Sequence, residues 1–271
     1  MGKSKGISTT EILVALALST LISLIVTSLF VTSSNLYVKN KKAFELNEDT
    51  RNAIATIEYL FSRWGAGVPC KDNKCVINNS LPPCDDYPPS DPQCITIKDN
   101  GREVEFFGNL YGFGFITNST VDTAEAISCG LSSDEKQNCY LVWEKGEVKM
   151  KDGKPSVYSI NLDKNNVDCY HSLEQAKVKI SLVPQDTDNN ATVASGTYIS
   201  RAPFKIRLYV QDGFLFVDKI DQSSCNYNEA NIKIGKVKNF EVKSQERSIV
   251  VNITFTSKDG KERKLQKVYG K

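Results

Sequence analysis

The sequence predicts an α+β protein, in which one long N-terminal helix, first transmembrane and then amphipathic, packs on a C-terminal antiparallel β-sheet domain. Three observations lead to this fold class. No glycine or proline occurs from Ile7 to Trp64, which favours one continuous helix. After Ile95, alternating apolar and polar residues are separated by Asn-Gly, Lys-Gly and Asp-Gly pairs, which are typical of hairpins. Eight cysteines all follow the helix and indicate a disulfide-bonded domain.

The predicted helix has two halves of different character, and its full length is about 85 Å at 1.5 Å per residue. No charged residue lies between Glu11 and Lys39, so the first half can cross a bilayer, and we expect the membrane anchor at residues 12–31. The second half is amphipathic up to residue 64, and Gly65 and Pro69 then end the helix. Its apolar stripe, at spacings of three and four, consists of Ile54, Ile57, Leu60, Phe61 and Trp64.

The residues before the helix form an unusual leader. A secretory signal peptide is cut after its apolar region, next to small residues. Here the leader is short, and the plausible cut between Gly6 and Ile7 keeps the apolar helix in the mature chain. Glu11 stands at the edge of that helix. A carboxylate deep in a bilayer costs roughly 2.5–3.5 kcal/mol on insertion scales, so we expect Glu11 to have a partner.

Gly6, the apolar Ile7 and Glu11 at the fifth mature position, followed by a long apolar run, resemble the N-terminal signal of type IV prepilins. The resemblance implies that a prepilin peptidase removes residues 1–6 and that the new amino group of Ile7 is methylated. It also implies that Glu11 neutralises the N-terminal amine of a neighbouring helix inside an apolar filament core. The alternative is a plain membrane anchor with an isolated glutamate.

The cysteines indicate an oxidising compartment, because an even set confined to one side of an anchor is typical of disulfides. None forms a C-x-x-C pair, which argues against zinc-ribbon and thioredoxin-like sites. The lysines flanking the anchor favour the opposite orientation, but large domains translocate largely regardless of charge. We expect local bridges, namely Cys70–Cys75, Cys84–Cys94, Cys129–Cys139 and Cys169–Cys225, although the sequence alone does not fix the pairing.

Beyond the helix, a loop rich in proline and cysteine is predicted at residues 70–94. Four hairpins follow from the turn pairs: residues 95–97 with 104–106, 140–143 with 148–150, 204–210 with 214–217, and 249–255 with 264–268. Residues 157–162 and 178–183 are predicted as further strands, and residues 121–127 and 172–176 as short helices. The predicted domains are therefore the leader at 1–6, the helix at 7–64 and one β-rich domain at 65–271.

The region after the anchor extends the resemblance. Thr50-Arg51-Asn52-Ala53-Ile54 and the later Gly65-Ala66-Gly67 look similar to the helical turn and the Ala-Gly turn of PilW-type minor pilins. The dense cysteines and the lack of a proline in the apolar helix depart from many major pilins. The resemblance implies a pilin-like fold and a minor pilin, which is a structural subunit for the assembly or initiation of a type IV pilus, at or near the filament tip.

Two alternatives stay open beside the minor pilin. A type II secretion pseudopilin of the J type has the same parts, and a membrane-tethered adhesin or DNA-binding tip protein would use the globular domain. The partners implied by the resemblance are the prepilin peptidase, other major and minor pilins, and inner-membrane lipid. The implied location is a single-pass inner-membrane protein whose domain lies in the periplasm and then in the extracellular pilus.

Charge gives little support for nucleic acid as a partner. The net charge is +2, so there is no overall basic surface for DNA or for a surface ligand. The C-terminal tail is nevertheless basic, with Lys258, Lys261, Arg263, Lys264, Lys267 and Lys271. Such a tail is typical of a lysine-decorated edge strand, which discourages association between sheets. A DNA-binding strip is the alternative.

The sequence contains no constellation that would support catalysis. His171 is the only histidine, and its neighbour Cys169 is expected to be bridged, which argues against a Cys–His pair. Nucleophile elbows, phosphate-binding loops and zinc-protease motifs are absent from the sequence. Asp186 and Asp188 form a weak calcium candidate, because the segment lacks the glycine and distal glutamate of an EF-hand. We therefore expect neither enzymatic activity nor a cofactor.

Overall fold

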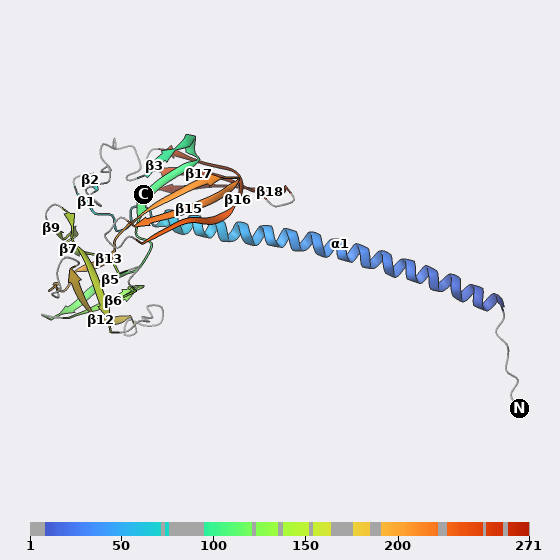
Figure 1. Cartoon of the computed structure of the whole chain (residues 1–271), viewed down its shortest axis with the longest axis horizontal. Helices are drawn as coiled ribbons and strands as arrows, with labels where there is room; N and C mark the ends of the chain where they lie inside the picture. Colours follow the sequence, from blue (N-terminus) through green and yellow to red (C-terminus); the bar gives the residue numbers. More distant parts are fainter. Residues whose placement is uncertain are drawn as a thin grey trace, which may run out of the picture. The chain divides into compact units, whose positions relative to one another are not determined.

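A computed structural model gives the structure of the chain and describes most of its residues (Figure 1). The described ranges are residues 9–71, 74–75, 95–120, 123–134, 138–151, 154–163, 176–184, 191–221, 227–245, 248–256 and 260–270. The chain divides into two compact units, Met1–Arg51 and Asn52–Lys271. All strands lie in the second unit, which also contains the last turns of the long helix.

The predicted continuous helix is confirmed as α1, which extends over 54 residues from Thr9 to Ser62. Gly65 and Gly67 follow it with φ values of 70° and 66°, in the left-handed region that favours glycine. The chain therefore leaves the helix in a tight turn. That turn is tied to a strand, because the amide of Gly65 donates to the carbonyl of Phe107 at 2.6 Å.

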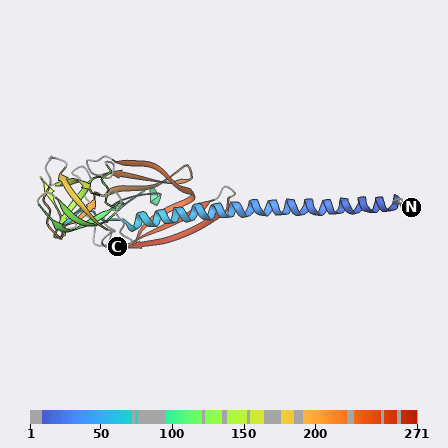
Figure 2. The same cartoon turned by 90° about the horizontal axis from the view of Figure 1, so that it is seen from below.

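A curved sheet of seven antiparallel strands forms the first part of the β-rich unit (Figure 2). Its strand order is β18-β17-β16-β15-β14-β4-β3. The strands are β3 (Ile95–Lys98), β4 (Glu103–Gly108), β14 (Phe204–Gln211), β15 (Phe214–Asp221), β16 (Asn228–Gln245), β17 (Ser248–Thr256) and β18 (Glu262–Gly270), and η1 (Asp99–Gly101) joins β3 to β4. Register shifts interrupt the pairing of the long strand β16 with both β15 and β17, which lets the sheet bend.

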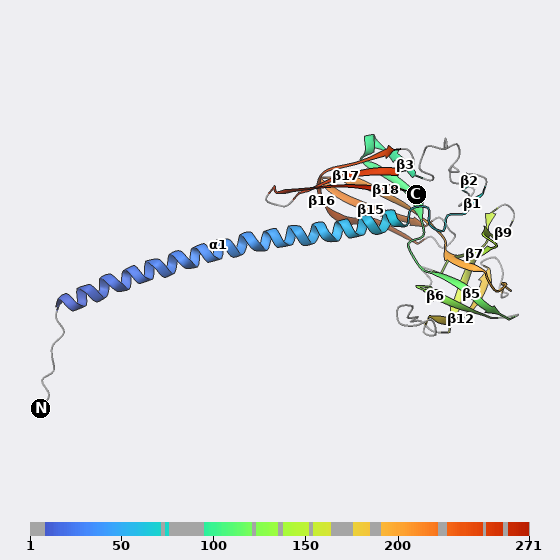
Figure 3. The same cartoon turned by 180° about the vertical axis from the view of Figure 1, so that it is seen from behind.

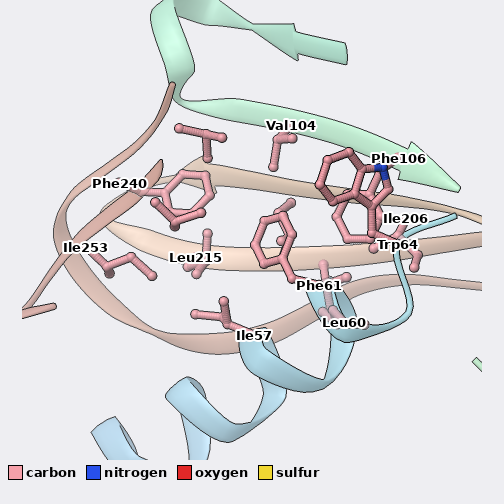
Figure 4. Close-up of a cluster of buried hydrophobic side chains, with 14 of the residues drawn as sticks. Ile57, Leu60, Phe61, Trp64, Val104, Phe106, Ile206, Leu215, Phe240 and Ile253 are labelled. Atoms are coloured by element: carbon pink, nitrogen blue, oxygen red, sulfur yellow. The ribbon is translucent and has the colours of Figure 1, made fainter. Parts of the chain in front are cut away.

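The end of α1 supplies one side of the core of the curved sheet. Figure 4 shows Ile57, Leu60 and Phe61 of the helix, and Trp64 in the turn that follows it, pointing toward Phe106, Ile206, Leu215 and other side chains of the strands. Each of these four side chains is at most 3% exposed. The Phe61 ring stacks between Phe106 and Tyr269, with centroid distances of 5.0 and 4.6 Å. The predicted apolar stripe is thus confirmed as the face that the helix buries.

A closed barrel forms the second part of the β-rich unit (Figure 3). Its strands follow the order β11-β12-β6-β5-β13-β7, and β7 pairs again with β11 to close the ring. They are β5 (Phe113–Ser119), β6 (Ala124–Cys129), β7 (Tyr140–Glu144), β11 (Val157–Leu162), β12 (Lys177–Pro184) and β13 (Tyr198–Arg201). The short strand β8 (Glu147–Val148) forms a hairpin with the end of β7. The barrel has its own core, which includes Ile116, Val142, Ile160, Ile180 and Ile199.

The barrel is inserted between two neighbouring strands of the curved sheet. Phe204 at the start of β14 pairs with Gly108 at the end of β4, and the barrel is the chain between them. Gly108 must be glycine, because a Cβ there would lie 2.2 Å from the carbonyl oxygen of Arg63. The exit point from the sheet is therefore packed directly against the turn after α1. Two small hairpins, β1 (Cys70–Lys71) with β2 (Lys74–Cys75) and β9 (Met150–Lys151) with β10 (Lys154–Pro155), complete the strands.

The predicted α+β class, with a single pilin-like sheet, is wrong. Within the part of the chain that the structure describes, most residues lie in strands, and these strands form a barrel and the curved sheet. The hairpins that the turn pairs predicted are present, but local pairs do not reveal which hairpins share a sheet. The contact of β7 with β11, which closes the barrel, has no local signal in the sequence.

Most of the individual elements were predicted in the right place. The hairpins β3–β4, β7–β8, β14–β15 and β17–β18 and the strands β11 and β12 are confirmed. The short helix predicted at residues 121–127 is wrong, because Ala124–Cys129 is strand β6, in which Ala124, Ala126 and Ser128 are buried and the residues between them are partly exposed. The helix predicted at 172–176 and most of the loop predicted at 70–94 lie outside the described residues.

Candidate functional site

The first candidate site is the apolar part of α1. Leu18–Lys41 is long and apolar enough to cross a membrane, and none of it is buried. Large side chains such as Leu24 and Phe30 are 71% and 74% exposed. An apolar helix that stays fully exposed needs an apolar environment, which a bilayer or other helices can provide. The chain therefore carries one N-terminal helix suited to a single-pass membrane anchor.

The residues of the predicted processing signal surround the start of that helix. Gly6 and Ile7 lie outside the described residues. Glu11 lies in the first turn of α1, where the free amide groups and the helix dipole favour a negative charge. The position is thus electrostatically suited to a carboxylate even before any partner is considered. The predicted cut and the predicted contact of Glu11 with a neighbouring amine stay predictions.

Four cysteines lie in the part of the chain that the structure describes, namely Cys70, Cys75, Cys129 and Cys139, and the other four lie outside it. Cys70 and Cys75 are direct partners across the β1–β2 hairpin, which suits the predicted bridge between them. Cys139 is fully buried and disulfide-bonded. Cys129 lies in β6, but its side chain is not among those described, so the predicted Cys129–Cys139 pairing stays a prediction. The other two predicted bridges, Cys84–Cys94 and Cys169–Cys225, lie outside the described residues.

The weak metal and catalytic candidates also lie outside the described residues, namely Asp186, Asp188 and His171. Within the described part of the chain, no group of three or more histidine, cysteine, aspartate or glutamate side chains could hold a metal ion.

A buried ion pair joins the barrel to the curved sheet. Arg201 ends β13 in the barrel, Asp221 ends β15 in the curved sheet, and Arg201 Nη2 lies 2.7 Å from Asp221 Oδ2. Both side chains are fully buried. The guanidinium also lies over the Phe204 ring, 4.9 Å from its centroid, and donates to the carbonyl of Ala202. Two charges removed from water in this way stabilise a structure only while both are present.

The sequence did not reveal this pair. Arg201 and Asp221 belong to different sheets and are separated by a whole hairpin strand, so no periodicity links them. The only local sign is a charged residue at the end of each apolar strand, which many exposed strand ends share.

A polar cavity of about 430 Å³ lies on the outer face of the curved sheet. Its wall includes Arg207, which pairs with Glu103 at 2.8 Å and lies over the Tyr209 ring, 4.6 Å from its centroid. The hydrogen bond to Glu103 raises the pKa of Arg207. Tyr209 in turn donates to Asn231 Oδ1 at 2.8 Å. Opposite charges are paired across this face, an arrangement that suits a solvated sheet surface better than catalysis.

The basic tail forms an edge of the curved sheet. β18 pairs with β17 alone, so the predicted edge strand is confirmed. Lys267 pairs with Glu58 of α1 at 2.7 Å, and Lys238 of β16 pairs with Glu262 at 2.5 Å. Part of the positive charge is therefore neutralised within the protein. Lys258 and Lys271 lie outside the described residues.

Comparison with known proteins gives one relative of significant similarity. No protein-family model matches the chain, and no solved structure matches it significantly. The chain is 27% identical over 243 residues to an uncharacterized protein of Aquifex aeolicus (strain VF5), covering 88% of this chain and 84% of the relative. The residues of this chain that the match does not cover are fewer than the residues of Phe113–Arg201, the stretch that contains the barrel. The similarity therefore includes at least part of the barrel.

Proposed function

We propose that this chain is a minor pilin of the PilW type, a structural subunit that takes part in the assembly or initiation of a type IV pilus. The observation that carries the proposal is Gly6 and Ile7 followed by Glu11 in the first turn of a helix whose apolar span, Leu18–Lys41, is not buried. The proposal does not rest on the fold of the β-rich unit, which differs from the pilin-like sheet that the sequence predicted.

The proposed mechanism is physical rather than catalytic. Cleavage after Gly6 exposes the amino group of Ile7, while the apolar helix holds the chain in the inner membrane. Glu11 of one subunit then approaches the amino terminus of another, so that each charge is neutralised in an apolar bundle of helices. Unpaired, each charge would be costly there. The β-rich unit stays in the periplasm and then in the extracellular filament.

The test replaces Gly6 by valine in full-length protein, with Gly2→Val as the matched control in the same leader. We expect Gly6→Val to keep residues 1–6 and to abolish surface pili, and Gly2→Val to be processed normally. Intact-mass measurement of the amino terminus and electron microscopy of filaments give the two readouts. Normal processing of Gly6→Val would remove the basis of the proposal.

The same experiment separates the pilus from the secretion system. A type II secretion pseudopilin of the J type would depend on the same three residues, because its assembly uses the same signal. Blocked processing together with normal pili and lost protein secretion would assign the chain to that system instead.

A further inference from the structure

A group of basic side chains gathers at one end of the curved sheet. β16 changes its partner strand between Lys236 and Val237, from β15 to β17. Phe255 of β17 lies opposite both Val237 of β16 and Arg263 of β18, so the bend of β16 and the start of β18 are neighbours across β17. We call the five basic residues of this end the basic rim, and all of them are exposed: Lys236, Lys238, Lys261, Arg263 and Lys264.

The basic rim has an excess of positive charge. Two carboxylates lie at the same end of the sheet. Glu262 is 2.5 Å from Lys238, and Asp212 precedes Gly213, whose carbonyl accepts a hydrogen bond from the amide of Val237. Five positive side chains and these two carboxylates give this end a net charge of +3.

Protection of a sheet edge does not account for the basic rim. Lysines on an edge strand discourage association between sheets, which explains Lys264 on β18. Lys236 and Lys238, however, belong to β16, which has β15 and β17 as partners. Basic residues in the middle of the sheet, by contrast, face carboxylates, as in the pairs Lys205–Glu105 and Arg207–Glu103. The unbalanced charge is therefore a feature of this end of the sheet.

β18 runs beside the last turns of α1 and in the same direction. Near its end, the ring of Tyr269 stacks on that of Phe61, with a centroid distance of 4.6 Å. Two residues earlier in β18, Lys267 Nζ lies 2.7 Å from the carboxylate of Glu58. The contacts thus move back along the helix as β18 is followed back toward its start.

The basic rim lies further along this line. A Cβ on Gly235, the residue before Lys236, would lie 3.5 Å from Ala53 of α1 and 3.6 Å from Phe255. Phe255 is in turn the partner of Arg263. The basic rim is therefore level with Ala53, at the end of the curved sheet from which α1 enters the β-rich unit.

Only a short piece of helix separates Ala53 from the apolar span. The span ends at Lys41, twelve residues earlier, and α1 is continuous between the two. These residues rise by about 18 Å at 1.5 Å per residue. The headgroup layer extends roughly 5–8 Å beyond the hydrocarbon core, and an anionic surface acts about one Debye length further, about 8 Å. Long basic side chains bridge the remaining distance.

We propose that the basic rim binds the headgroups of anionic phospholipids in the membrane that holds the anchor, which keeps the β-rich unit close to the membrane surface. Ammonium and guanidinium groups donate charge-assisted hydrogen bonds to phosphate oxygens. Arg263 and Lys264 are successive strand residues and point to opposite faces of the sheet, so the charge is presented at its end. That arrangement suits a planar charged surface. The binding requires the anchor alone and is independent of the proposed role in pilus assembly.

The experiment uses full-length protein in two kinds of nanodisc. One contains phosphatidylcholine alone, and the other an equal mixture of phosphatidylcholine and phosphatidylglycerol. A water-soluble ester acylates the lysine amines, and mass spectrometry gives the rate at each lysine. Lys145 and Lys179, both exposed and both in the barrel part of the chain, are the internal references.

We expect the lysines of the basic rim to be acylated roughly threefold more slowly in the anionic nanodiscs than in the neutral ones. The two reference lysines should react equally in both. High salt should remove the difference, because it screens the attraction between exposed charges.

Paired variants separate binding from mere closeness to the membrane. Lys236→Gln with Lys264→Gln should restore fast acylation of Lys238 and Lys261, because two of the positive charges that hold the headgroups are lost. Lys145→Gln with Lys179→Gln removes the same charge from the barrel part and should leave the protection unchanged. All four positions are exposed, so circular dichroism should show both double variants folded.

Three results would overturn the proposal. The first is equal acylation of the basic rim in neutral and anionic nanodiscs. The second is unchanged protection in Lys236→Gln with Lys264→Gln, because slow acylation would then reflect only the position of the anchor beside an anionic surface. The third is equal protection by inorganic phosphate or by a thymidine oligonucleotide in neutral nanodiscs, which would assign the basic rim to a soluble anion.

Discussion

At the scale of single residues, two charges stand where charge is costly, and both require a partner. Glu11 lies in the first turn of a helix that becomes apolar, and Arg201 is fully buried between two sheets. The partner of Arg201 is Asp221, within the same chain. The partner proposed for Glu11 is the amino terminus of another subunit. The charge of Arg201 therefore concerns folding, whereas the charge of Glu11 concerns assembly only in the proposed function.

Replacing Glu11 by alanine tests the assembly contact. Glu11→Ala removes a charge but keeps the apolar helix, so we expect normal insertion and normal cleavage after Gly6. Incorporation into filaments should fall about tenfold or more, because the neighbouring amine would be left unpaired. Glu48→Ala, at an exposed position of the same helix, is the control. Quantitative immunoblotting of purified filaments measures both, and normal incorporation of Glu11→Ala would refute the role.

Removing one half of the buried pair should be far more damaging than removing both halves. Asp221→Asn leaves the Arg201 charge buried without a counter-charge, which should lower the free energy of unfolding by about 3–5 kcal/mol. The double variant Arg201→Met with Asp221→Leu should lower it much less, because no charge stays buried. Urea unfolding in micelles gives these values.

A surface pair provides the control for that comparison. Lys219 and Glu229 lie 2.6 Å apart and are both partly exposed. Glu229→Gln should change the free energy of unfolding by no more than about 1 kcal/mol, as is usual for exposed pairs. An equal loss in Asp221→Asn and Glu229→Gln would show that burial of the Arg201–Asp221 pair is unimportant.

At the scale of elements, the local pattern predicted four hairpins, two further strands and the C-terminal end of the helix, but missed β5 and β13 of the barrel. Periodicity reports which face of an element is apolar, and the Asp-Gly pair at Asp212 and Gly213 reports where a hairpin turns. The strand at Ala124–Cys129 was missed because its short alanine-rich pattern also suits a helix. The long strand β16 was missed because its outer positions are mostly lysine and asparagine, and its bends disturb the alternation.

A substitution at Gly108 tests how closely the end of β4 packs against the turn after α1. Gly108→Ala should lower the free energy of unfolding by about 2–4 kcal/mol, because the new methyl group would meet the Arg63 carbonyl where the chain leaves the curved sheet. Gly235→Ala is the control, since a methyl group there would lie 3.5 Å from Ala53, an ordinary contact. Thermal unfolding followed by circular dichroism compares them, and similar midpoints would contradict the packing described at Gly108.

At the scale of the whole molecule, the described residues of the β-rich unit form two large cores, one in the curved sheet and one in the barrel, and a smaller cluster around Leu141. The curved sheet is completed by the end of α1, and the barrel is completed by its own closure. The chain must pass from β4 through the whole barrel before β14 can pair with β4. We predict that the expected bridges, where they form, contribute to stability by limiting the unfolded chain.

The oxidation state of the cysteines tests both the predicted compartment and the contribution of disulfides to stability. We expect protein purified from its native compartment under non-reducing conditions to contain no free thiol among its eight cysteines. Reduction should lower the unfolding midpoint, because the unfolded chain gains entropy. Thiol alkylation followed by mass mapping identifies the pairs. Eight alkylated cysteines in the native protein would contradict the disulfides and the oxidising location.

The sequence by itself determined the continuous helix, its apolar and amphipathic halves and four of the hairpins, and it carries the pattern from Gly6 to Glu11 on which the proposed processing rests. These features depend on residues that are close together in the chain. Only the tertiary structure decided that the strands form a barrel and a curved sheet, that Arg201 meets Asp221, and that the bend of β16 lies beside the start of β18. These features depend on pairings between distant strands, which the two cores select by burying apolar surface and which no local pattern encodes.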